Sequence, residues 1–92
     1  MPPTRRPIVL LTVDSDDAAE REFRLRANYA EAIAEAGGAA LMLPQVEAAI
    51  GAALEVAHGL VLTGTAPGIQ VDAGRRDFER RLLARALGRD MP

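Results

Sequence analysis

The residues with the clearest chemical potential stand where short apolar runs end. The acidic segment DSD at 14–16 follows the apolar run at 8–13, and Gly64 and Thr65 follow the run at 59–63. Paired aspartates can act as nucleophile and acid, or can hold a cation through oxygen ligands. A glycine-led turn can instead aim backbone N–H groups at a negatively charged oxygen. If both runs are parallel strands, the two segments share the sheet edge at which open α/β sheets bind ligands.

The composition of the chain removes several kinds of chemistry. There is no cysteine, which excludes a disulfide, a thiolate metal site and a thiol nucleophile within these residues. All 11 basic residues are arginines, so lysine Schiff-base chemistry and a Walker-type phosphate lysine are excluded as well. The net charge of -2 argues against nucleic acid as a partner. We predict no metal and no other cofactor.

The apolar runs are also too short for a membrane segment. None approaches the ~20 consecutive apolar residues that cross a bilayer. The run at 8–13 follows two arginines but ends at Asp14, and it is shorter than the ~7 to 15 apolar residues of a signal peptide. We therefore expect no membrane association and a cytoplasmic location.

Apolar periodicity predicts three strands that alternate with three helices. The continuous apolar runs, typical of strands buried on both faces of a parallel sheet, lie at 8–13, 39–43 and 59–63. Helical spacing predicts helices from about Asp17 to Gly37, over 46–57 and over 74–87. The prediction is a single partial α/β domain over residues 1–92.

Two of the helices have particular sequence support. Asp17 and Glu20 have capping-box spacing, and Glu22 and Arg26 are separated by four residues, so both pairs favour a first helix that begins near Asp17. In the last helix a packing stripe is predicted from Phe78, Leu82 and Ala86, widened by Leu83 and Leu87.

Short connections between alternating strands and helices predict a parallel sheet with flanking helices and right-handed crossovers. The architecture is then a Rossmann-like or flavodoxin-like half-domain. Periodicity alone does not separate the strand order 2-1-3 from 3-2-1.

Three segments together resemble the N-terminal part of the gamma-glutamyl-gamma-aminobutyrate hydrolase family, which is class I glutamine amidotransferase-like. These segments are YAEAIAEAGGAALMLP at 29–44, GLVLTG at 59–64 and RRDFERRLLARALGRDMP at 75–92. The resemblance implies a flavodoxin-like sheet with strand order 2-1-3. It also implies that a fourth strand and a turn with the nucleophilic cysteine follow, and that a histidine base and an acidic residue lie further along. We therefore expect the chain to be truncated before its nucleophile and inactive alone.

The same resemblance identifies the candidate substrate-binding residues. Gly64 and Thr65 match the place where the family has two glycines that help build the oxyanion hole and substrate pocket. No catalytic residue is assigned, and the position of His58 does not match the catalytic base, so we interpret it as a partly buried turn residue. The ligand implied is a gamma-glutamyl small molecule, once a complementary chain or a second copy covers the open sheet edge and completes the site.

The family's RDxFE-like helix start resembles this chain at Arg76, Asp77 and Glu79. Asp77 and Arg81 are four residues apart, so we expect an ion pair that supports the helix. The further arginines of this helix are interpreted as a solvated face that complements the helix dipole.

Two alternatives remain from the residues themselves. The chain could be a non-catalytic α/β interaction module whose open sheet edge is covered by another subunit. The segment DSD at 14–16 also resembles the DxD opening of haloacid-dehalogenase-type phosphotransferases, which require Mg²⁺. That chemistry usually includes a lysine that balances phosphate charge, and the chain has none.

Overall fold

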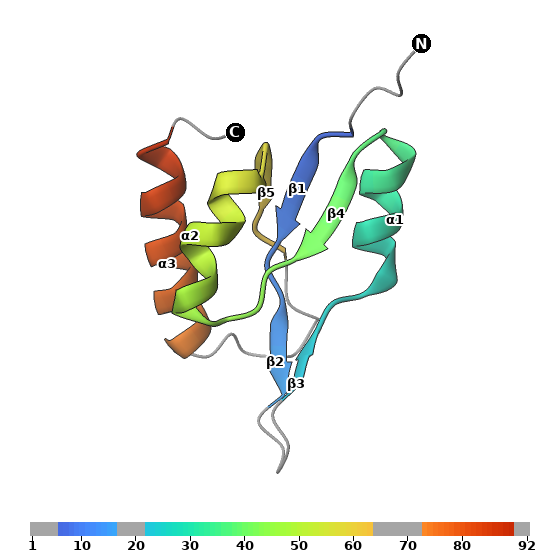
Figure 1. The fold of residues 1–92 in the computed structure, drawn as a ribbon. Helices are drawn as coiled ribbons and strands as arrows, with labels where there is room; N and C mark the ends of the chain where they lie inside the picture. The colour runs from blue at the N-terminus through green and yellow to red at the C-terminus, as the bar shows by residue number, and fades with distance from the viewer. Residues whose placement is uncertain (1–5, 17–21, 64–72, 90–92) are drawn as a thin grey trace.

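Three parallel strands form the central sheet in the computed structural model, which describes residues 6–16, 22–63 and 73–89. They are β1 (Ile8–Leu11), β4 (Ala39–Met42) and β5 (Gly59–Val61). The order across the sheet is β4-β1-β5 (Figure 1), with Leu10 opposite Leu41 on one side and Leu60 on the other. This is the predicted order 2-1-3, and the predicted α/β class with a parallel sheet is confirmed.

The helices cover both faces of this sheet. They are α1 (Ala27–Glu35), α2 (Glu47–Val56) and α3 (Ala73–Leu87). In Figure 1, α1 lies beside β4, whereas α2 and α3 lie next to each other on the opposite side of the molecule. Within the described ranges, no helix combines the length and the hydrophobicity that a bilayer span requires.

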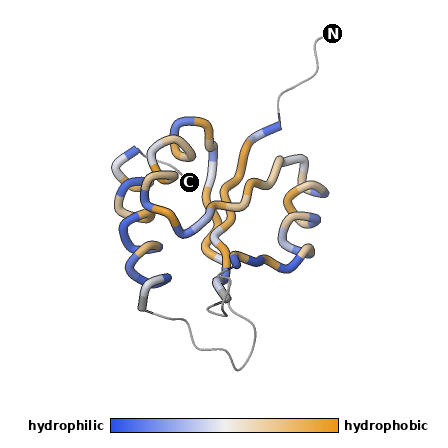
Figure 2. The backbone as a smooth tube through the Cα atoms, turned by 60° about the horizontal axis from the view of Figure 1, so that its bottom comes forward, coloured by the Kyte–Doolittle hydropathy of each residue, from blue (hydrophilic) through white to orange (hydrophobic). Residues whose placement is uncertain are grey.

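The hydrophobic core lies between the sheet and the α2–α3 pair. Its buried members are Leu10, Leu43, Ile50, Leu54, Phe78, Leu82 and Ala86. Figure 2 shows the strands as apolar segments and α3 as a largely polar helix, so only one stripe of α3 enters this core. The stripe predicted for α3 is thereby confirmed, but its widening is wrong: Leu83 is 40% exposed and Leu87 is 63% exposed. Both leucines lie on the flank of the helix because the stripe that turns toward the sheet is narrow.

A short antiparallel ribbon extends from the central strand and replaces the predicted start of the first helix. Strand β2 (Asp14–Asp16) pairs with β3 (Glu22–Arg24), and α1 begins only after Arg26, whose side chain makes no capping hydrogen bond. The helix predicted from Asp17 is therefore wrong over 22–26. Phe23 is half-buried between exposed neighbours, which is the two-residue alternation of a strand. The predicted capping box at Asp17 and Glu20 lies outside the described residues.

Two glycines end α1 where the sequence predicts the end of a helix. Gly37 has φ of +95°, a conformation that glycine adopts without steric cost. Gly38 leaves room for close packing, because a Cβ there would lie 2.9 Å from Cγ2 of Ile33. The pair thus turns the chain from α1 directly into β4.

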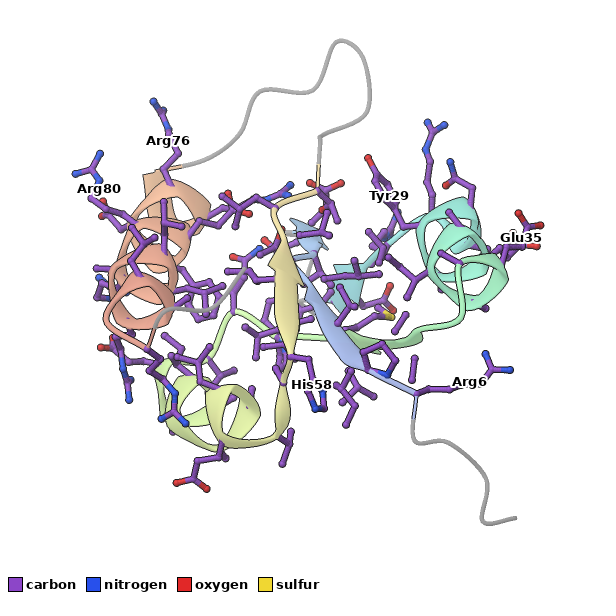
Figure 3. All side chains as sticks on the ribbon, turned by 90° about the horizontal axis from the view of Figure 1, so that it is seen from above. Arg6, Tyr29, Glu35, His58, Arg76 and Arg80 are labelled. Carbon is purple, nitrogen blue, oxygen red and sulfur yellow. The ribbon has the colours of Figure 1, made fainter. Side chains whose placement is uncertain are left out.

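His58 connects the beginnings of β5 and β1. Its side-chain Nδ1 accepts a hydrogen bond from the backbone N–H of Ile8 at 3.0 Å. The backbone N–H of His58 donates to the Ile8 carbonyl at 2.7 Å. The residue is exposed rather than partly buried as predicted. It lies at the amino ends of the strands (Figure 3), the edge opposite to the carboxyl ends at which ligands bind in such sheets.

Replacing His58 with alanine is expected to lower the free energy of unfolding by about 1 kcal/mol, because the Ile8 N–H loses its acceptor. Urea unfolding followed by circular dichroism measures the change. His58→Asn is the matched control, since its side-chain oxygen can accept the same hydrogen bond. Equal losses in both variants would show that the imidazole acceptor contributes nothing.

Candidate functional site

The carboxyl ends of the parallel strands meet at one edge of the sheet and are tied together there. The N–H of Thr12, just beyond β1, donates to the carbonyl of Val61 in β5 at 3.2 Å. On the other side of β1, Gln45 Nε2 donates to the Val13 carbonyl at 2.8 Å. Ligands in open α/β sheets bind beyond this edge, so the strand ends carry the candidate site.

Two threonines join the end of β1 to the end of β5. The Thr63 N–H donates to Thr12 Oγ1 at 2.8 Å, and the Thr63 hydroxyl donates to the Thr12 carbonyl at 2.7 Å. Both residues are buried. Because hydrogen bonds in a dry environment are costly to leave unmade, this pair holds the two strand ends at one separation.

A buried arginine extends the threonine pair into a larger polar network. Arg75, at the beginning of α3, is only 3% exposed. Its Nη2 donates to the Thr63 carbonyl at 2.8 Å and to Thr63 Oγ1 at 3.1 Å. Its Nη1 donates to Asp14 Oδ1, and its Nε donates to Glu79 Oε2 at 3.4 Å. The guanidinium thus contacts the ends of both strands and the next turn of its own helix.

The charges of this network explain why an arginine can be buried here. A buried cation must be paired, since removing it from water costs several kcal/mol. Among the described residues, Asp14 and Glu79 are carboxylate partners of Arg75, and both retain some contact with solvent. The network therefore compensates the buried charge of Arg75. It also leaves the carboxylate of Asp14 partly exposed at the sheet edge.

The structure describes some of the predicted site residues and not others. Gly64 and Thr65, the predicted substrate-binding pair, lie outside the described residues, directly after Thr63. Asp14 belongs to β2 and accepts from Arg75, whereas the buried Ser15 Oγ has no hydrogen-bond partner within the described part of the chain. The same part contains no group of three acidic, histidine or cysteine side chains that could hold a metal ion.

The ion pairs of α3 differ from the predicted ones. Arg81 pairs with Glu47 of α2 at 3.1 Å rather than with Asp77. Arg76 is exposed, and Figure 3 shows its side chain directed away from the sheet. The arginine that reaches the site is its neighbour Arg75, which pairs with Glu79 four residues later in α3. The resemblance of Arg76, Asp77 and Glu79 to the family's helix start stays a prediction.

Sequence reasoning missed Arg75, although a signal for it exists. Arg75 is three residues before Phe78, so it continues the stripe that also contains Leu82 and Ala86. A charged residue on a buried helical stripe must find a partner, and polar residues at the ends of neighbouring strands are the available ones. Helical periodicity thus locates the arginine, but only the three-dimensional structure identifies what it binds.

Comparison with known proteins adds one finding to this geometry. The family model described as Peptidase C26 matches residues 10–92, a span that includes the second half of β1, all of β4 and β5, the polar network and α3. A search of curated proteins found no significant match.

Proposed function

Because the chain belongs to the Peptidase C26 family, which is class I glutamine amidotransferase-like, we propose that it forms the strand-end half of a site that hydrolyses gamma-glutamyl amides. The observation that carries this proposal is the network that joins the buried Arg75, Thr63 and Thr12 to the partly exposed Asp14. It holds the carboxyl ends of β1 and β5 together at the sheet edge where such folds bind ligands. An acyl-transfer site needs this kind of fixed backbone close to the reacting carbonyl.

The proposed reaction uses a cysteine thiolate, which the 92 residues do not contain. The thiolate attacks the gamma-carbonyl carbon, and the C–N bond breaks while a histidine gives the leaving amine its proton. Water then hydrolyses the thioester and releases glutamate. In this proposal, the thiolate, the histidine and the acidic residue come from a polypeptide segment outside the 92 residues of this sequence.

The contribution of this chain is electrostatic and geometric. We assign backbone N–H groups at Gly64 and Thr65 to the oxygen that becomes negative during attack, as the family resemblance implies. Support comes from Thr63, the preceding residue, whose carbonyl and hydroxyl are both held by Arg75. Oxyanion donors act without reorganisation only when the backbone that carries them is fixed beforehand.

The complementary segment is proposed to cover the open edge of β5. Within the described ranges, β5 pairs only with β1 and is an edge strand; its last residue, Val61, and the next residue, Leu62, are both exposed. Leu83 and Leu87 of α3 are exposed apolar residues as well. Exposed strand edges that carry apolar side chains favour association with another strand, and the proposed occupant is the strand that precedes the cysteine turn.

The decisive experiment mixes this chain with a polypeptide that carries the cysteine turn, histidine and acid of a Peptidase C26 protein. Release of gamma-aminobutyrate from its gamma-glutamyl amide is expected from the mixture and from neither component. A partner with cysteine replaced by serine serves as control and is expected to associate without turnover. Stable association of the active pair without any hydrolysis would reject the proposal and leave a non-catalytic interaction module.

A matched pair of variants tests which edge is covered. Val61→Lys places a charge at the β5 edge, whereas Met42→Lys places one at the opposite edge strand, β4; both residues are exposed. We expect Val61→Lys to weaken association by at least about tenfold, the cost of about 1.4 kcal/mol, and Met42→Lys to leave it unchanged. Sedimentation of the mixtures measures both, and the reverse result would place the partner at β4.

The phosphotransferase interpretation gains no specific support. Asp14, the first aspartate of DSD, is hydrogen-bonded to Arg75, and DSD itself forms the strand β2. We therefore do not propose it as a second function.

A further inference from the structure

Arg75, in α3, joins the ends of two strands that are distant from each other along the chain. Its partner Asp14 is 61 residues away, Thr63 is 12 residues away, and Glu79 is 4 residues away in α3. Asp14 follows β1 and Thr63 follows β5, so one side chain spans both strand ends and the beginning of α3.

The guanidinium is suited to fix geometry rather than to add stability. It is planar and presents its N–H donors in a rigid fork, so partners on different donors are held at set directions from one another. Buried ion pairs often contribute no more stability than apolar residues of the same volume. An arginine with only 3% exposure and partners on three elements is therefore better explained by the arrangement it imposes.

We propose that Arg75 is a positioning residue for the gamma-glutamyl hydrolase reaction. It acts through Thr63: Nη2 holds the Thr63 carbonyl, which belongs to the peptide unit that leads into the proposed oxyanion donors. Arg75 itself is buried and does not contact substrate. This inference rests on the proposed function for its role in catalysis, but its effect on the backbone is measurable without any activity.

The first test is amide hydrogen exchange in the 92-residue chain, measured for Arg75→Lys, Arg75→Met and the control Arg80→Met. Lysine keeps the charge but not the rigid fork, and Arg80 is an exposed residue of the same helix that points away from the sheet (Figure 3). Arg75→Lys is expected to raise exchange at the Thr63 amide by about tenfold or more, while amides of Leu10 and Leu82 change little. The control is expected to change none of them.

The other possible results of the exchange experiment would contradict the proposed role of Arg75. Equal acceleration at Thr63 and in the core, or a chain unfolded by Arg75→Lys, would show a purely structural role. No change at Thr63 would show that Arg75 does not fix this backbone. If only Arg75→Met unfolds the chain, the exchange rates of Arg75→Lys decide whether Arg75 fixes the backbone at Thr63.

The second test uses the assembled enzyme and separates this inference from the proposed function. Arg75→Lys is expected to lower kcat by roughly 10- to 100-fold with little change in KM, because a displaced donor affects the transition state most. An equal fall in the Arg80→Met control, or a change in KM alone, would contradict positioning. If the wild-type assembly shows no turnover, the proposed function fails. The exchange data still show whether Arg75 fixes the backbone at Thr63.

Discussion

Leu82→Ala is expected to cost the chain about 2–5 kcal/mol of unfolding free energy, the usual range for a leucine removed from a packed core. Leu82 is 0% exposed and belongs to the buried core cluster, which includes residues of β1, α2 and α3. A 92-residue domain has only about 5–14 kcal/mol in total. A loss near 3 kcal/mol lowers the Tm of such a domain by roughly 12–24 °C.

Leu83→Ala is the matched control for this prediction. The two leucines are adjacent, but Leu83 is on the exposed flank of α3. Its replacement is expected to change the unfolding free energy by less than about 0.5 kcal/mol, as for most surface positions. Thermal unfolding by circular dichroism measures both variants, and similar shifts in Tm would mean that α3 packs through a different stripe.

Thr12→Val is expected to destabilise the chain by about 1–3 kcal/mol, because the buried N–H of Thr63 loses its acceptor. Valine has nearly the same shape as threonine, so the loss reflects the missing hydroxyl rather than a cavity. The change also removes one of the bonds that hold the end of β5 beside the end of β1. Urea unfolding measures the free energy, and faster exchange of the Thr63 amide locates its origin.

Thr12→Ser separates the hydroxyl from the methyl group. Serine keeps the acceptor for the Thr63 N–H and is expected to recover most of the lost stability. If serine and valine cost the same, the methyl packing of Thr12 is what matters, and the hydrogen bond between the strand ends has no net value.

Much of the architecture could be predicted from the sequence. The bounds of strands β1, β4 and β5 and of helices α2 and α3 all lie within two residues of the predicted bounds. Each depends on neighbours in the sequence: a continuous apolar run for a buried strand, or an apolar residue every third or fourth position for a helix. The ribbon of β2 and β3 was missed because a three-residue strand shows little more than one alternation, whereas ion-pair spacing and a capping pattern both favoured a helix.

The candidate site was predictable only as a location. The strand ends follow from the strand runs, and the α/β class indicates that ligands bind beyond them. Helical periodicity places Arg75, but not Arg76, on the predicted packing stripe of α3. Arg75 was missed because a charged residue on such a stripe is expected to be buried only when partners are present, and Asp14 and Thr63 are brought to it by the fold.

The types of the main elements, the buried stripe of α3 and the absence of cysteine and lysine chemistry in these residues all follow from residue type and spacing. The extension of β1 into a ribbon, the partners of Arg75 and the threonine hydrogen bonds between strand ends depend on the folded arrangement. The two groups differ in the range of the interactions that produce them. Periodicity and turn chemistry act over a few residues, whereas Asp14, Thr63 and Arg75 meet only after two crossovers have brought the strand ends to one edge of the sheet.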